Sequence, residues 1–124
     1  MEPLKIDATV DTPAVLLDAA GNVFELSGKS YPEDTVEFYT PVLNWLDDYC
    51  LHPNTKTTFV FRLKYFNSAS YKPIYDIITR MEQIQEKGFG AAVQWYYKDG
   101  DSDMKTAGED FSELVNVPFI FSAM

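Results

Sequence analysis

Two serine hydroxyls stand close together in the segment Asn67-Ser68-Ala69-Ser70, just ahead of a helical pattern. Backbone N–H groups at a helix N-terminus are free to bind an anion, and the helix dipole favours negative charge there. A phosphate carried by Ser68 would therefore be tolerated at this position. Spacing alone favours a purely structural interpretation, in which Ser70 caps the helix and Ser68 is a turn residue, because serine caps are common.

A second group of residues has the alternating carboxylates of a calcium-binding loop. Asp99, Asp101 and Asp103 occupy alternate positions, and Asp110 falls at the twelfth place. The sixth place, however, is Met104 rather than the glycine that the loop needs, and the usual closing glutamate is absent. This segment predicts a solvated turn that caps the following helix, so we expect no metal and no cofactor.

Cys50 and His52 could in principle form a nucleophile and its base. They lie two residues apart near a predicted helix end, and no third partner is evident, so a small buried cysteine and a loop histidine are the better interpretation. The single cysteine also excludes an internal disulfide and a cysteine-based zinc site. The chain lacks a paired base and nucleophile and a glycine-rich phosphate loop, so no set of residues supports a catalytic domain.

Hydropathy patterns predict the element order β-β-α-β-α-β-α-β. We expect strands at 14–18, 23–27, 57–66, 90–97 and 117–121. Helices are expected from near Pro32, over 71–87 with Ser70 as N-cap, and after the 99–103 turn with Ala107, Phe111, Leu114 and Val115 facing inward. The first helix should carry an apolar stripe of Val36, Tyr39, Val42, Leu43, Leu46 and Cys50, with a kink or break at Pro41.

The sheet should be mixed rather than fully parallel. Arg62, Lys64 and Gln94 lie within predicted strands, and a parallel sheet covered on both faces would rarely place such residues there. We therefore expect residues 1–124 to form a single α/β domain with an N-terminal β-hairpin, a mixed sheet and helices mostly on one face. The loops at 29–33, 67–72 and 98–103 then meet at one sheet edge, where binding sites of open α/β sheets collect.

Composition narrows the classes of partner. The 124 residues are 46% hydrophobic and 15% aromatic, which indicates an ordered domain, and the net charge of −9 disfavours nucleic acid and anionic membrane surfaces. The first residues contain no apolar segment of signal-peptide length, and no apolar run approaches the roughly 20 residues of a membrane helix. We expect a soluble, cytoplasmic protein without membrane insertion.

Several short motifs occur in a characteristic order along nearly the whole chain. They are TPAV at 12–15, SGKSYPED at 27–34, YFNSAS followed by Lys72 from position 65, WYYKDGD at 95–101, GEDF at 108–111 and PFIF at 118–121. Together they resemble the SiaC-type regulatory phosphoprotein family of bacteria. The resemblance implies a fold like that of anti-sigma-factor antagonists (STAS-like) and a non-enzymatic switch protein.

The resemblance also implies a signalling cycle. A dedicated protein kinase would phosphorylate one hydroxyl, a PP2C-like phosphatase would reverse this, and the unphosphorylated form would bind and activate a diguanylate cyclase that promotes biofilm formation through cyclic di-GMP. The phosphosite falls on Ser68. The family often has Thr-Ser-Ser after the asparagine, whereas this chain has Ser-Ala-Ser, so Ala69 removes one competing hydroxyl and Ser70 is the main rival.

We expect the partner surface to surround Ser68 at the loop edge. Its candidate residues are Tyr31, Phe66, Asn67, Ser68, Ser70, Lys72, Tyr96 and Tyr97. Because neighbouring strand residues face opposite ways, only one of Tyr96 and Tyr97 should point to a given face. The alternative is a small-molecule-binding or catalytic domain that uses the same loop edge.

Overall fold

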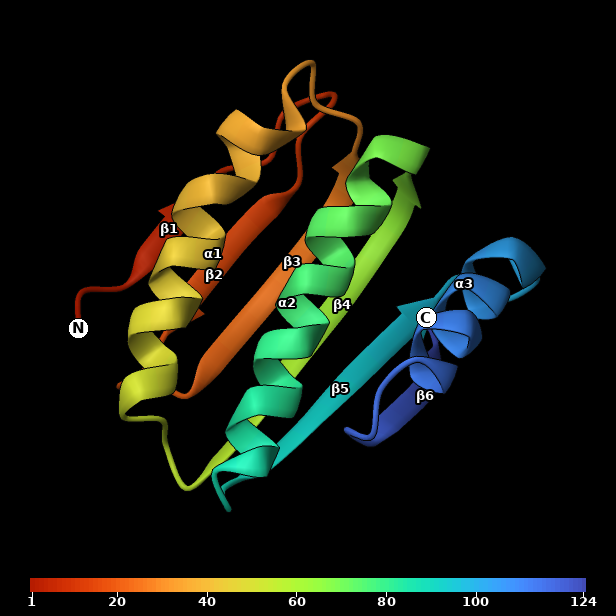
Figure 1. The fold of residues 1–124 in the computed structure, drawn as a ribbon. Helices are drawn as coiled ribbons and strands as arrows, with labels where there is room; N and C mark the ends of the chain where they lie inside the picture. Colours follow the sequence, from red (N-terminus) through yellow and green to blue (C-terminus); the bar gives the residue numbers. More distant parts are fainter.

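Six strands and three helices account for most of the chain, and the computed structural model describes residues 1–124 (Figure 1). The elements are β1 (Leu4–Ile6), β2 (Ala14–Asp18), β3 (Val23–Ser30), α1 (Thr35–Leu51), β4 (Lys56–Phe66), α2 (Ser68–Glu86), β5 (Gly90–Tyr97), α3 (Ser102–Glu113) and β6 (Phe119–Ala123). The predicted element order is confirmed apart from β1, whose three residues are too few to show a pattern. None of the three helices is long and apolar enough to cross a membrane.

The strands form one sheet in the order β1-β2-β3-β4-β5-β6. The first three strands pair antiparallel, whereas β3, β4, β5 and β6 pair parallel. This confirms the mixed sheet with an N-terminal hairpin. It also brings the carboxyl ends of β3, β4 and β5, and the loops that follow them, to the same edge of the sheet.

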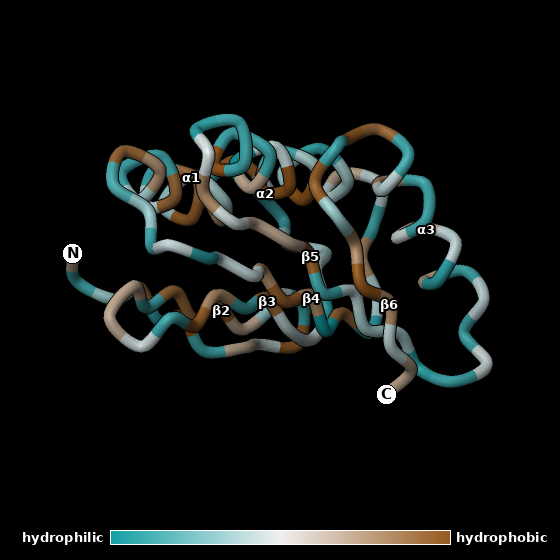
Figure 2. Tube along the Cα trace, turned by 90° about the horizontal axis from the view of Figure 1, so that it is seen from below, coloured by the Kyte–Doolittle hydropathy of each residue, from teal (hydrophilic) through white to brown (hydrophobic).

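All three helices lie on one face of the sheet, as predicted. Figures 1 and 2 show α1 and α2 side by side over the strands, with α3 beyond α2 near β5 and β6. Aromatic contacts hold α3 in place: the Phe111 ring stacks on Tyr71 of α2 at 4.6 Å between centroids and lies 5.7 Å from Trp95 of β5. The core between helices and sheet therefore forms one continuous cluster of buried residues.

The opposite face of the sheet is open. Arg62 forms an ion pair with Glu25 at 2.8 Å, and its guanidinium lies 3.9 Å from the centroid of the Tyr96 ring. Gln94 donates to the Ser122 hydroxyl on the same face. Arg62 and Gln94 were among the reasons for expecting a partly uncovered face, and their polar partners, Glu25 and Ser122, lie on that face rather than in the core.

The first helix differs from the prediction in two ways. It begins at Thr35, with Asp34 as N-cap accepting from the Glu37 backbone N–H at 3.0 Å, rather than near Pro32. It also continues without a break through Pro41. Pro41 and Glu37, whose carbonyl loses its helical donor, are both exposed, so water replaces the missing bond.

Two residues expected in apolar stripes are instead exposed. Val36 of α1 is 74% exposed and Leu114, just after α3, is 54% exposed. Val36 lies in the first turn of α1, where it lines an open groove rather than the core. Leu114 is the C-cap of α3, where the chain leaves the helix and turns away from the core.

The closest approach between α3 and the sheet generates a stability prediction. A Cβ atom on Gly108 would lie 2.5 Å from the Trp95 ring, which is itself fully buried and donates its indole N–H to the Met104 carbonyl at 3.0 Å. We expect Gly108→Ala to lower the free energy of unfolding by about 1–2 kcal/mol, because overpacking outweighs the gain of about 1 kcal/mol in helix propensity. Urea unfolding measures this.

The control variant is Thr106→Ala, an exposed position in the same helix. It should be as stable as the wild type or slightly more stable. A Gly108→Ala protein as stable as Thr106→Ala would show that the α3–sheet contact is less tight than the structure indicates.

Candidate functional site

The first turn of α2 carries the predicted phosphosite. Asn67 is the N-cap, and its side-chain oxygen accepts from the Ser70 backbone N–H at 3.0 Å. Ser68 is therefore the first residue of the helix, and its side chain is exposed with no hydrogen-bond partner in the structure. The prediction that Ser70 caps a helix starting at Tyr71 is wrong, because asparagine caps as well as serine does and lies three residues earlier.

Ser70 has a different role from the predicted one. It is fully buried, and its hydroxyl oxygen lies 2.8 Å from Ser30 Oγ, 2.8 Å from Asn67 Oδ1 and 3.0 Å from the Ser30 carbonyl. The Tyr39 hydroxyl lies 2.5 Å from Ser30 Oγ. We call Ser30, Tyr39, Asn67 and Ser70 the hydroxyl cluster; it joins the end of β3, the second turn of α1 and the start of α2.

Sequence reasoning did not assign Ser30 or Tyr39 to the site. One signal was available: a tyrosine on a buried helical stripe needs a partner for its hydroxyl. Its burial raises the pKa of Tyr39 to about 12, and the hydrogen bonds with Ser30 and Ser70 only partly oppose this. The tyrosine is thus held neutral, as a hydrogen-bonding group.

The electrostatic setting of Ser68 differs from that of the other helix starts. The first turns of α1 and α3 contain Glu37 and Asp103, whereas the first turn of α2 contains no acidic residue. The positive end of a 19-residue helix is therefore not neutralised by its own sequence. One turn after Ser68, Lys72 pairs with Asp76 at 2.6 Å. An ion pair at the surface contributes little to the stability of the protein.

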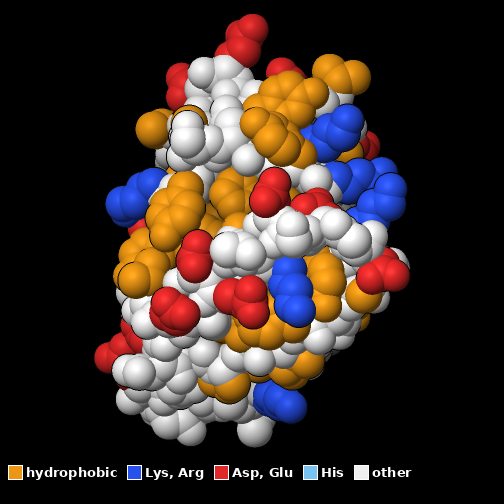
Figure 3. Space-filling model, turned by 90° about the vertical axis from the view of Figure 1, so that its right-hand side faces the viewer, with side chains coloured by type: hydrophobic (Ala, Val, Ile, Leu, Met, Phe, Trp, Pro, Cys, Tyr) orange, Lys and Arg blue, Asp and Glu red, His pale blue; other side chains and the backbone are white.

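Aromatic side chains surround the carboxyl edge of the sheet. The rings of Tyr31 and Tyr65 meet edge to face at 5.8 Å and are 38% and 51% exposed. Phe66 is half-buried, and Tyr71 is 40% exposed on top of Phe111. Figure 3, which views the molecule from the side of α3, shows exposed hydrophobic side chains mixed with charged ones rather than one large apolar area. Such a mixed, tyrosine-rich surface is typical of protein interfaces.

The structure does not place all the predicted partner-binding residues on this surface. Tyr97 ends β5 on the helix side, with Lys105 Nζ 5.8 Å from its ring centroid. Tyr96 faces the open side of the sheet, under Arg62. Ser70 lies beneath the surface, so neither Ser70 nor Tyr96 shares a face with Ser68, whereas Tyr31, Phe66, Asn67, Lys72 and Tyr97 lie at the same edge as Ser68.

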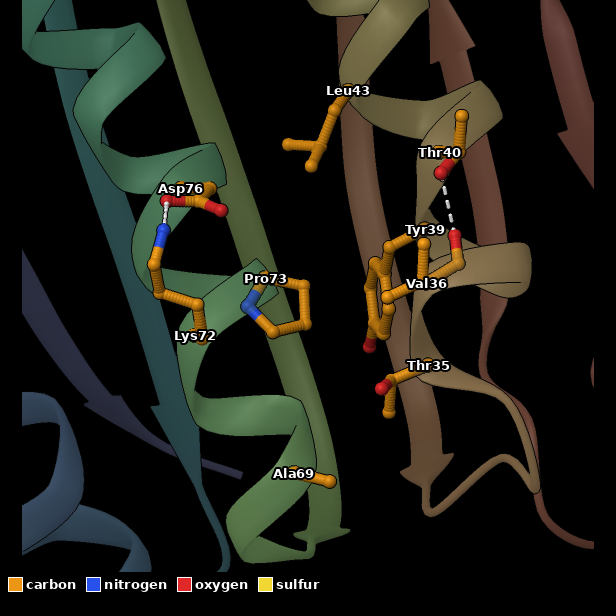
Figure 4. Close-up of a pocket in the computed structure, with 9 residues that line it drawn as sticks. All are labelled: Thr35, Val36, Tyr39, Thr40, Leu43, Ala69, Lys72, Pro73 and Asp76. Carbon is orange, nitrogen blue, oxygen red and sulfur yellow. Dashed lines mark hydrogen bonds and ion pairs between the residues drawn. The ribbon is translucent and has the colours of Figure 1, made fainter.

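An open groove of about 310 Å³ lies between α1 and α2, beside the first turn of α2. Figure 4 shows Tyr39 and Leu43 on the α1 side of it and Ala69 and Pro73 on the α2 side, while the Lys72 side chain runs along α2 to Asp76. Because Ala69 follows Ser68 directly, the groove is continuous with the first turn of α2.

The other candidate sites of the sequence have structural roles. Asp101 caps α3 by accepting from the Met104 backbone N–H at 3.0 Å, as the sequence predicted, and no cluster of His, Cys, Asp or Glu side chains could hold a metal ion. Cys50 is buried, which raises the pKa of its thiol, and His52 is the exposed C-cap of α1. These two residues form no catalytic pair.

A small α/β fold that presents an exposed serine on an unneutralised helix start is suited to regulation by modification. The model of the SiaC family, described as regulatory phosphoproteins, matches residues 6–124, and the chain belongs to this family. Family membership confirms the prediction of a signalling protein that is not itself an enzyme.

Similar proteins come from Pseudomonas aeruginosa. An uncharacterised protein of strain UCBPP-PA14 is 28% identical over 123 residues, which is 99% of this chain and 98% of that protein. The crystal structure of apo-SiaC is 27% identical, with a TM-score of 0.89 over 99% of this chain and 100% of the other. SiaC in complex with the diguanylate cyclase SiaD, of which it is the activator, gives a TM-score of 0.90 at 27% identity, covering 98% and 99% of the two chains.

The cap of α2 can be tested directly. Asn67→Ala removes the acceptor of two hydrogen bonds from Ser70 and should lower the free energy of unfolding by about 1–2 kcal/mol. Asn67→Asp keeps an acceptor and adds a negative charge at the helix start, so it should retain wild-type stability. Urea denaturation distinguishes the variants; equal stability of Asn67→Ala and wild type would contradict the assigned cap.

Tyr39 predicts an alkaline loss of stability. Because the pKa of Tyr39 is about 12 in the folded protein and 10.0 in its unperturbed state, the unfolded chain releases this proton first. Its contribution is fully present below pH 10 and is lost as the pH rises toward 12, by about 2–3 kcal/mol for a shift of this size. Urea unfolding across this range should fall more steeply for wild type and for Tyr65→Phe, an exposed control, than for Tyr39→Phe; parallel curves would contradict the assignment.

Proposed function

We propose that this protein is a phosphorylation-controlled switch that binds and activates a diguanylate cyclase when Ser68 is unmodified. A dedicated protein kinase adds the phosphate and a PP2C-like phosphatase removes it, which links the protein to cyclic di-GMP signalling and biofilm formation. The observation that carries the proposal is the exposed Ser68 hydroxyl at the first position of α2, in a member of a regulatory phosphoprotein family. The similar SiaC that activates the cyclase SiaD supports the choice of partner.

The proposed partner surface consists of Tyr31, Phe66, Asn67, Ser68, Lys72 and Tyr97. These residues come from the ends of β3, β4 and β5 and from the first two turns of α2, which the parallel pairing brings to one edge. Ser70 and Tyr96 are left out, since one is buried and the other faces the open side of the sheet.

Charge explains how the phosphate would act. A phosphoserine carries about −1.5 to −2 charges at neutral pH. Within a close-packed contact this charge would be buried without a partner, which is strongly unfavourable. In the free protein the same charge lies at the helix N-terminus, where it is stabilised. Phosphorylation should therefore release the partner without unfolding the switch protein.

The compartment follows from the proposed chemistry. A protein kinase needs ATP and a diguanylate cyclase needs GTP, and both nucleotides are cytoplasmic. We therefore propose that the protein acts in the cytoplasm.

The decisive variants change charge at Ser68. Ser68→Ala should bind the cyclase constitutively, and Ser68→Asp should bind at least about tenfold more weakly, because a carboxylate must be desolvated in the contact. Thermal unfolding of both should stay close to wild type. Ser102→Asp is the matched control, since Ser102 is also the exposed first residue of a helix capped by an Asx side chain, in α3.

Titration calorimetry with the purified cyclase measures these affinities, and phosphopeptide mapping locates the modification. Phosphate found on Ser70 or Tyr71 instead of Ser68 would contradict the assigned site. If stoichiometrically phosphorylated protein and Ser68→Asp both bound the cyclase as tightly as Ser68→Ala, the release mechanism would be wrong.

A further inference from the structure

The hydroxyl cluster contains most of the polar groups in the core. The buried hydroxyls are those of Ser30, Tyr39, Tyr49, Thr57 and Ser70, and three of these five meet at the first turn of α2. Burying hydroxyls is unfavourable unless each is hydrogen-bonded, and apolar residues of similar size would pack equally well. A fully bonded polar cluster under the modified turn therefore indicates a positioning role.

The direction of the hydrogen bonds follows from counting donors and acceptors. The Tyr39 hydroxyl is buried, and its partners are Ser30 Oγ at 2.5 Å and the more distant Ser70 hydroxyl, so its O–H must donate to a serine hydroxyl, the nearer being Ser30 Oγ, or be left unpaired. Ser30 then donates to Ser70, whose own O–H is left to donate to Asn67 Oδ1 or to the Ser30 carbonyl. The tyrosine of α1 thus directs the Ser70 proton toward the cap of α2.

We propose that Tyr39, acting through Ser30 and Ser70, is a positioning residue that holds the first turn of α2 so that Ser68 alone is presented for modification. The proposal rests on the proposed function in that it takes Ser68 as the phosphosite. It assigns a role to buried residues that touch neither the kinase nor the cyclase. Because Tyr39 also lines the groove between α1 and α2, the two helices are coupled at this point.

Removing the Tyr39 hydroxyl loosens the cluster. In Tyr39→Phe, Ser30 Oγ loses the donor that fixes its rotamer, so Ser30 holds the Ser70 hydroxyl less firmly against the Asn67 side chain. The hydrogen bond from the Ser70 hydroxyl to the cap oxygen is then formed for a smaller fraction of the time, and the turn that carries Ser68 opens more often. The Ser70 hydroxyl becomes accessible in those open states.

Tyr49→Phe is a closely matched control. Tyr49 lies on the same helix, is 1% exposed like Tyr39, and its hydroxyl is bonded to the buried Thr57 hydroxyl at 2.7 Å and to the Asn54 backbone N–H at 2.9 Å. These contacts lie at the amino end of β4, at the opposite edge of the sheet. The two variants should therefore lose similar global stability, and only Tyr39→Phe should alter the modified turn.

The test combines backbone hydrogen exchange with kinase labelling. In Tyr39→Phe the amides of residues 70–72 should exchange about fivefold faster than in Tyr49→Phe at equal global stability, as the loss of one hydrogen bond implies. Kinase assays should show a lower kcat for Ser68 with a smaller change in KM, and phosphopeptide mapping should detect a fraction of phosphate on Ser70. The kcat for Ser68 and the site of phosphorylation both depend on how the turn is positioned. A purely structural role of Tyr39 would change neither of them.

The outcomes separate this inference from the proposed function. If wild type is not phosphorylated at Ser68, the proposed function is wrong and hydrogen exchange alone decides the positioning role. If wild type is modified at Ser68 but Tyr39→Phe and Tyr49→Phe agree in amide exchange, in kcat and in the site of modification, the positioning role is wrong and the proposed function stands.

Discussion

The hydrogen bonds of the Ser70 hydroxyl to Ser30 and Asn67 are the constraint on which the site depends. They join the end of β3 to the start of α2, while the backbone N–H of Asn67 donates to the Ser30 carbonyl at 3.0 Å. Both strand ends, β3 and β4, are thus tied at the point where α2 begins. The exposed Ser68 is consequently held on a turn fixed from below.

The hydroxyl cluster holds the start of α2 from below, and the surface above it, around Ser68, contains only simple functional groups. The surface contains hydroxyls, tyrosine rings and a lysine, and no group poised for catalysis. Under the proposed function, one charge added at Ser68 has opposite effects in two states: it is stabilised at a free helix N-terminus and strongly disfavoured within a protein contact. The proposed switch needs a difference in desolvation between the two states, and no change of fold.

The arrangement of the sheet and the helices could be predicted from local sequence patterns. Alternation in β4, which buries Phe59, Phe61 and Leu63, and the isoleucine stripe of α2 each specify a buried face, and the charged Arg62 specifies an open one. Element boundaries were less predictable. Asn67 and Ser70 have similar capping preferences, so spacing alone could not decide which of them starts the helix.

The sequence by itself determined the mixed α/β fold, the family motifs and the candidate hydroxyl at Ser68, because periodicity, charge and motif order are local properties of the chain. Only the tertiary structure decided that Ser70 is buried, which of Tyr96 and Tyr97 faces the open side of the sheet, and that Tyr39 reaches Ser30 and, through it, the first turn of α2. Ser30 and Ser70 are forty residues apart. The sequence could predict that the loops after β3 and β4 meet at one edge, but the contact between these two side chains depends on the register of β3 against β4, which no local pattern encodes.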